Sequence, residues 1–518
     1  MSTIEELSNR FGPSYKWFVT VTVMLGTIAT TATATIVNVG MPYIAGQFSM
    51  GADEVQWLSS AFLAAMTASM LLINWIAPSF GERTAYVGAI ALFVAASLLG
   101  AASPDKMIVI LARTLQGAAS GIIQPLAMAM IFKVFPRNQR GLAMGIYGVG
   151  VVLAPAMGPT AGGYFVDAYN WRYLFLIVIP FCLLALPGSF IFLPNAKAEK
   201  RTSFDGLGFL LITVFLFASL GALSNGQRQG WDSALVDGLF TIAFIALLTF
   251  IILELHLNHP ILELRVFQSR TFTTACLVAF ALGAGIYGST YLVPLFVEGI
   301  QEYNPTSAGL VLMPSGLVLG IVFPLAGALS DRVRAHWPII VGLSFFAYSS
   351  WLFSGIDVNT WFWTTAFWAA LGRVGLGFIL PSMNAGALKE LPMELVTAGS
   401  GVINFIRQAG GAFGVNLLTV LVDRRSMFHS SHLAQTQTPG NYADMEMIRQ
   451  MSIILNQWGN PFGNRAPGGI PPGVLPQLSR TIIPKAQMFA YQDGFMVLAL
   501  VFLLAIIPAW MMGNARGR

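Results

Sequence analysis

Long runs of apolar residues, separated by short polar segments, recur along the whole chain. Runs of about 18 or more apolar residues are long enough to cross a bilayer as helices. The runs fall into a group of six, a pair and a second group of six, at 17–40, 55–76, 84–102, 107–130, 141–164, 172–193, 207–223, 234–255, 272–298, 308–329, 337–355, 361–385, 396–421 and 488–512. The pattern therefore predicts an all-α integral membrane protein with about fourteen transmembrane helices.

The basic residues between these runs predict the orientation of the chain. Most of them lie in alternate loops, with Arg83, Lys133 and Arg140 as examples, whereas the intervening short loops hold few. Loops rich in lysine and arginine stay in the cytoplasm, so both termini are expected there. Residues 423–487, rich in Pro, Gly, Asn and Gln, would form a long external loop with a short amphipathic helix near 442–455. This loop is either a tolerated flexible segment or a docking surface for an external partner.

Three features of the first half of the chain recur in the second. Pro42 is matched by Pro294, the loop APSFGERT by GALSDRVR, and Arg113 by Arg373, at a separation of about 250 residues each time. We infer two pseudo-symmetric six-helix halves, residues 1–200 and 261–518, that flank an inserted helix pair at 201–260. Transporters with this plan bind their substrate between the halves, near the middle of the membrane.

Composition excludes several other classes of protein. Hydrophobic residues make up 55% of the chain and charged residues only 10%, whereas soluble domains carry about 25% charge. The net charge of +5 comes from the loops between the spans and does not indicate nucleic-acid binding. Cys182 and Cys276 lie in apolar runs, so neither a disulfide framework nor a metal site is indicated. We expect no cofactor, and the sequence shows no catalytic triad spacing or phosphate-binding loop of an enzyme.

The uncharged stretch 141–164 carries small residues at helical spacing. Such a small-xxx-small ridge lets another helix approach closely, and two prolines within it would kink the helix. It is either an ordinary packing face or the close contact that seals the two halves against leakage while they rock. The residues of the ridge and its prolines are Gly150, Ala154, Pro155, Gly158, Pro159, Gly162 and Gly163.

Several motifs resemble those of a known family. LARTLQGAASG, GPTAGG and GALSDR resemble three signatures of the major facilitator superfamily. TIVNVGMPYIAGQF, FDGLGFLLI followed by SNGQRQGW, and NFIRQAGGAFG resemble the fourteen-helix drug:proton antiporters of the EmrB/QacA type. Three positions differ from the pattern of that family, one of them after the seventh span, where Ser224, Asn225 and Gly226 stand in place of Asp-Arg-Gly. Thr33 stands where its first helix usually carries Asp, and the loop APSFGERT keeps only Gly81 and Arg83 of the usual motif.

The resemblance implies a major facilitator fold and a function. It implies a multidrug or toxic-compound efflux transporter that exports amphiphilic small molecules by proton antiport and alternating access. It also implies a place in the bacterial inner membrane as the EmrB-like subunit of a tripartite pump. The partners of that pump would be a periplasmic adaptor (membrane fusion protein) and an outer-membrane channel. The alternative is a facilitator or importer of small organic solutes that has the same fold without proton antiport.

Charged residues within the expected spans are candidates for proton coupling, because a charge at the bilayer centre is costly. Arg113, one helical turn from Gln116, lies in a superfamily motif and would respond to a carboxylate; alternatively it extends to the external surface. Glu298 follows an apolar run that would raise its pKa, or else it caps its helix at the external surface. Arg407 lies in NFIRQ and, like Arg373, would bind an anionic group or neutralise an acid.

Polar and amphipathic residues on the spans are candidates for the substrate cavity. They are Asn38, Trp57, Gln116, Gln124, Arg373 and Asn404. Because the interior holds few acids, we expect neutral or anionic amphiphiles as substrates. A cytoplasmic loop containing Gly327, Asp331 and Arg332 is expected to hold the halves in one state through charge pairs. Otherwise its charges only follow the positive-inside rule.

Overall fold

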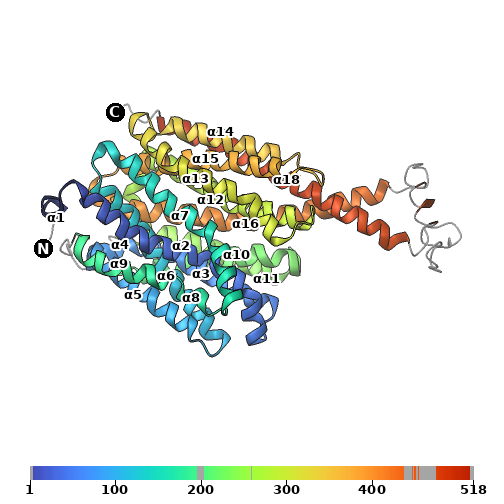
Figure 1. The fold of residues 1–518 in the computed structure, drawn as a ribbon, viewed down its shortest axis with the longest axis horizontal. Coiled ribbons are helices and arrows are strands. Elements are labelled where there is room, and N and C mark those ends of the chain that lie inside the picture. The colour runs from blue at the N-terminus through green and yellow to red at the C-terminus, as the bar shows by residue number, and fades with distance from the viewer. Residues whose placement is uncertain are drawn as a thin grey trace.

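The computed structural model describes residues 4–194, 203–257, 260–436 and 474–513, together with positions 446, 449, 450 and 453. These residues form helices, and no β-strand occurs among them (Figure 1). Besides the short 3-10 turns η1 to η4, the elements are α1 (Ile4–Phe11), α2 (Tyr15–Phe48), α3 (Ala52–Ser69), α4 (Ile73–Phe80), α5 (Glu82–Ala101), α6 (Lys106–Val134), α7 (Arg140–Ala168), α8 (Tyr173–Leu176), α9 (Ile179–Phe192), α10 (Gly206–Gln229), α11 (Ala234–His256), α12 (Arg270–Gly299), α13 (Pro305–Arg332), α14 (His336–Phe353), α15 (Phe362–Lys389), α16 (Val396–Thr436) and α18 (Val474–Gly513).

Among the described residues, 11 helices are long and apolar enough to cross a membrane. The number becomes 12 if α3 and α4, which meet at a bend of 58°, count as one broken span. Each of the fourteen expected ranges falls on a helix, but α7 and α14 are outside the set of apolar spans, so fourteen crossings stay a prediction. The start of α1 and the end of α18 lie at the same end of the bundle (Figure 1). Their placement in the cytoplasm also stays a prediction.

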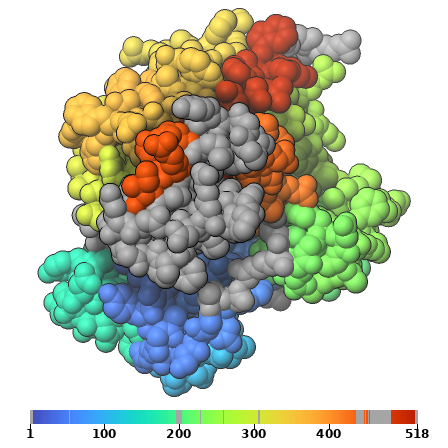
Figure 2. All heavy atoms as spheres, turned by 90° about the vertical axis from the view of Figure 1, so that its right-hand side faces the viewer, coloured from blue at the N-terminus to red at the C-terminus, as the bar shows by residue number. Residues whose placement is uncertain are grey.

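The helices before residue 194 and those after residue 270 form two adjacent groups, called here the first and second half. Helix α7 of the first half packs on α13 and α15 of the second, and α16 of the second half packs on α6, α3 and α4 of the first. Buried Tyr147 and Phe323 are part of the continuous apolar core across this interface. Figure 2 shows the inserted pair, α10 and α11, as a green lobe at one side of the two halves.

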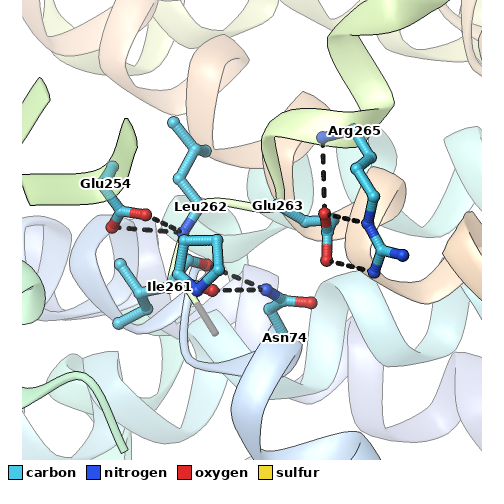
Figure 3. A network of polar contacts seen from close by, with 7 residues as sticks. Asn74, Glu254, Ile261, Leu262, Glu263 and Arg265 are labelled. Atoms are coloured by element: carbon cyan, nitrogen blue, oxygen red, sulfur yellow. Dashed lines mark hydrogen bonds and ion pairs between the residues drawn. The ribbon is translucent and has the colours of Figure 1, made fainter. Parts of the chain in front are cut away.

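The segment after α11 fastens the inserted pair to α4. The Asn74 side-chain amide, at the start of α4, donates hydrogen bonds to the Pro260 carbonyl at 2.9 Å and to the Ile261 carbonyl at 3.4 Å (Figure 3). Glu254, buried near the end of α11, accepts from the backbone N–H of Leu262 at 3.4 Å. Because α4 is also in contact with α16, the inserted pair is attached beside the interface between the halves.

Helices α16 and α18 run well beyond the rest of the bundle (Figure 1). With 41 and 40 residues they are each about 60 Å long, about twice the hydrocarbon thickness of a bilayer. Asp493 links α18 to α16 through ion pairs with Arg425 and with His429, the latter at 2.7 Å. The expectation of one loop over 423–487 is therefore wrong at both ends, where the chain is helical. Most of the expected helix at 442–455 lies outside the described residues.

The ridge in α7 packs within its own half. A Cβ on Gly150 would lie 2.0 Å from Cε of Met24, and one on Gly158 would lie 2.4 Å from Oγ1 of Thr35. The Thr35 hydroxyl also donates to the Pro155 carbonyl at 2.8 Å. Close packing is confirmed, but the partner of these glycines is α2 of the same half. The expectation that they seal the two halves against each other is wrong.

Candidate functional site

Asp331, the residue before the last in α13, binds the beginning of α7 in the opposite half. Its two carboxylate oxygens accept hydrogen bonds from the backbone N–H groups of Gly141 at 2.7 Å and Leu142 at 2.9 Å. The first N–H groups of a helix lack partners within it and carry partial positive charge, so a carboxylate is a favourable cap. Lys389 at the end of α15 forms an ion pair with the same carboxylate at 3.3 Å. The structure thus places Asp331 across the interface, where the latch was expected.

The backbones of α7 and α13 approach closely beside this carboxylate. A Cβ on Gly141 would lie 2.3 Å from the Gly327 carbonyl oxygen, and one on Gly327 would lie 2.5 Å from the Gly141 carbonyl oxygen. Any larger residue at either position would push the halves apart. Gly327 therefore serves the contact between the halves, whereas the Arg332 side chain is exposed.

Glu82 of α5 makes an equivalent contact across the interface, with α16. It begins α5 in the first half and accepts a hydrogen bond from the hydroxyl of Thr397, the second residue of α16. Lys133, near the end of α6, forms an ion pair with Glu82 at 2.6 Å and donates to Thr397 at 2.8 Å. Sequence reasoning missed Glu82 because the family motif has Asp–Arg in this loop. The internal repeat, which matches APSFGERT with GALSDRVR, could have identified Glu82 as a candidate.

Arg113 lies completely buried in α6, within the first half. It donates to the carbonyls of Leu58 at 2.9 Å and Thr33 at 3.2 Å, and its guanidinium carbon lies 4.2 Å from the ring centre of Phe62. It also donates to Oε1 of Gln116 at 3.1 Å, and Gln116 in turn donates to Ser97. Gln116, one helical turn away, is thus a direct partner of Arg113. The buried position differs from the alternative of an arginine that extends to the membrane surface.

Arg407 and Asn404 lie in α16 at the interface between the halves, and both are buried. Arg407 donates to Oδ1 of Asn404 at 2.7 Å, and the Asn404 amide lies 3.1 Å from the sulfur of Met128 in α6. The Tyr147 hydroxyl of α7 interacts with the Arg407 guanidinium and donates to the backbone carbonyl of Gln124 at 3.2 Å. These residues, Arg407, Asn404, Tyr147, Gln124 and Met128, are called the central cluster below. It joins both halves with a cation and neutral polar groups.

Arg373 of α15 lies in the second half, 9% exposed. It donates to the Thr290 hydroxyl of α12 at 2.9 Å. It also lines a cavity of about 20 Å³ that is formed by α12, α13, α14, α15 and α18. That volume is enough for about one water-sized occupant and excludes a drug-sized molecule. Neither the lining of this cavity nor the partner of Arg373 belongs to the central cluster that contains Arg407.

Comparison with known protein families identifies the family of this chain. The model described as Major Facilitator Superfamily matches residues 23–415. The chain belongs to this superfamily. It is therefore a multi-pass membrane transporter of small molecules and not an enzyme.

Bacterial members of the superfamily are similar over most of their length. The multidrug transporter protein MdtP of Bacillus subtilis is 31% identical over 76% of this chain and 72% of its own. The multidrug export protein EmrB of Haemophilus influenzae is 27% identical over 85% of this chain and 86% of its own. The solved structure of the human organic anion transporter MFSD10 covers 95% of this chain and 99% of its own, with a TM-score of 0.59 and 12% identity. At that identity the likeness shows the superfamily fold alone.

Three of the expected site residues of this superfamily member lie on exposed surfaces. Asn38 is exposed on α2 and accepts a hydrogen bond from Ser59 at 2.6 Å, and Trp57 is 49% exposed on α3. Glu298 is exposed at the next-to-last position of α12. A proton-carrying role for Glu298 stays a prediction. No group of three or more His, Cys, Asp or Glu with the arrangement of a metal site occurs in the described part of the chain.

Proposed function

We propose that this transporter exports amphiphilic, multidrug-type compounds across the bacterial inner membrane by alternating access and proton antiport. The observation that carries the proposal is the pair of carboxylate contacts, Asp331 to α7 and Glu82 to α16, at one end of the interface between the halves. Relatives named as multidrug transporters support the choice of cargo.

Alternating access requires contacts that exist in one state of the transporter and break in the other. Both carboxylates bind a residue of the opposite half, and both also bind a lysine at the end of a neighbouring helix. A hydrogen bond to a charged group contributes about 1.5–3 kcal/mol. Two such contacts can therefore determine which state is populated, yet substrate or proton binding can overcome them.

The central cluster is the proposed substrate site. Its only charged member is Arg407, so the cluster would favour neutral amphiphiles or amphiphiles with an anionic group. The thioether of Met128 and the ring of Tyr147 supply an adaptable apolar surface beside the polar groups. Asn38 and Trp57, exposed on α2 and α3, would line the approach to this cluster.

Protons are the proposed energy source. One elementary charge crossing 100 mV supplies about 2.3 kcal/mol, so a single titrating group would suffice for concentrative export. Arg113, Glu298 and Arg407 remain the coupling candidates. Thr33 does not supply the acid that the family usually has in the first helix. Its hydroxyl donates to the Ala29 carbonyl at 2.7 Å and its own carbonyl accepts from Arg113.

The helical extension formed by α16 and α18 is the proposed docking surface for a periplasmic adaptor. With it, the transporter would be the inner-membrane part of a tripartite pump that ends in an outer-membrane channel. Exposed apolar side chains on α16 include Met427 and Phe428. Co-purification of the adaptor with the wild type but not with a chain that lacks 427–482 would support this role.

Transport into everted membrane vesicles tests the proposed function. Drug uptake should require an imposed pH gradient and should collapse when an uncoupler dissipates it. Uptake that equilibrates the drug without responding to the gradient would instead identify a facilitator, the alternative function. Proton release on drug addition in Glu298→Gln then tests that residue by itself. An unchanged signal would remove Glu298 from the mechanism and leave antiport standing.

A further inference from the structure

The guanidinium of Arg373 is buried without a matching negative charge. One terminal nitrogen donates to Thr290, but the other, Nη1, is buried and has no hydrogen-bond partner among the described residues. No carboxylate forms an ion pair with Arg373 in the described part of the chain. A buried charge normally has a partner, since an uncompensated ion costs several kcal/mol.

Arg113, the equivalent arginine of the first half, is surrounded differently. Its Nη2 is also buried without a hydrogen-bond partner among the described residues, but two backbone carbonyls, one amide oxygen and the face of Phe62 share its charge. Arg373 has a single hydroxyl partner instead. Arg373, with this single partner, lines the small cavity between α12, α14, α15 and α18.

The lining of this cavity matches a small anion. Ser350 lines it together with Arg373, the hydroxyls of Ser289 and Ser349 donate to the carbonyls of Ile286 and Trp368, and Phe346 and Phe495 supply apolar walls. A water molecule would satisfy the hydrogen bond of Nη1 but would leave the charge uncompensated. A carboxylate-bearing drug would not fit into about 20 Å³. We propose that this cavity binds a monovalent anion of the size of chloride, held by Nη1 of Arg373 and the hydroxyl of Ser350.

Such an ion would have a structural consequence. Its ligands come from α14 and α15, so a bound anion would hold these two helices of the second half together. Gly372 keeps the space open, since a Cβ there would lie 2.8 Å from Oγ of Ser349. The site is independent of the proposed drug export, because it lies away from the central cluster and is too small for a drug.

Thermal unfolding of the purified full-length protein in detergent tests the site. Sodium chloride should raise the Tm by a few degrees in a saturable manner relative to sodium gluconate at equal ionic strength. Arg373→Gln should abolish the difference and should be no less stable than the wild type in gluconate, because it removes the uncompensated charge. The matched control, Arg113→Gln, should keep the chloride-dependent difference.

A second variant tests the space without removing the charge. Gly372→Ala keeps Arg373 but narrows the cavity, so the chloride concentration at half-maximal stabilisation should rise at least tenfold. Identical unfolding curves of the wild type in chloride and gluconate would overturn the proposal. So would a chloride effect that persists in Arg373→Gln or an unchanged half-maximal concentration in Gly372→Ala.

Discussion

Glu82 and Asp331 occupy equivalent places in the two halves, and each carboxylate binds the first turn of a helix in the opposite half. Asp331 caps α7 through two backbone N–H groups, and Glu82 binds the hydroxyl of Thr397 at the start of α16. A lysine at the end of the fourth long helix of each half, Lys133 or Lys389, completes both contacts. The two contacts close the same end of the interface between the halves.

Neutralising these carboxylates should open that end. Glu82→Gln and Asp331→Asn each weaken hydrogen bonds to a charged group, which contribute about 1.5–3 kcal/mol. The ratio of open to closed molecules should therefore rise roughly 10-fold to 100-fold. Ser400 is fully buried at this end and donates to the Pro125 carbonyl. Alkylation of Ser400→Cys, in a chain without Cys182 and Cys276, should accelerate accordingly.

Asp105→Asn is the matched control for that measurement. Asp105 caps the beginning of α6 and accepts hydrogen bonds from the backbone N–H groups of Met107 and Ile108, both within the first half. Its neutral variant should leave the alkylation rate of the cysteine at 400 unchanged. Equal rates in all carboxylate variants would show that Glu82 and Asp331 do not hold this end closed.

The glycine ridge of α7 should matter for the first half itself. In Gly158→Leu the new side chain collides with Thr35 and with the backbone of α2, and overpacking costs about 1–3 kcal/mol. We expect a lower Tm together with loss of drug export, although the protein still inserts into the membrane. Gly163→Ala, whose Cβ would meet its nearest atom at 4.0 Å, is the control. A normal Tm and normal export in Gly158→Leu would refute the role of the ridge.

The central cluster should determine substrate binding. Arg407→Gln removes its only cation, and export of an anionic amphiphile should fall at least tenfold through an increased KM. Tyr147→Phe loses one neutral hydrogen bond, about 1 kcal/mol, and should raise the KM about fivefold. Arg10→Gln, at an exposed arginine of α1, should change neither value. Export kinetics in everted vesicles distinguish these outcomes, and an unchanged KM in Arg407→Gln would place the substrate elsewhere.

The helices and several side-chain relationships could be predicted from the sequence. Apolar runs must be helical in a bilayer because their backbone groups have no water to bind, so each run fell on a helix. The spacing of Arg113 and Gln116 placed them one turn apart on one helix, where they form a hydrogen bond. The sequence did not predict that α16 extends beyond its apolar run, because the exposed polar turns of the extension lack the pattern that marks a membrane span.

Contacts between distant segments could not be predicted in the same way. Small residues indicate that some helix packs closely against them. The sequence around Gly158 does not show that this helix is α2 and not α13. Glu82 meets Thr397 across 315 positions of sequence, and no local pattern connects them. The exposure of Glu298 likewise depends on which helices surround the end of α12.

A distance measurement between the halves tests whether Glu82 and Asp331 hold this end of the interface closed. Spin labels at Asn138 and Glu394, exposed beside the closed end in the first and second half, report the separation by pulsed electron resonance in lipid. If the two carboxylates hold this end closed, the wild type should show one short distance and the Glu82→Gln, Asp331→Asn double variant should show a substantial population at longer distance. Identical distance distributions in the two proteins would contradict it.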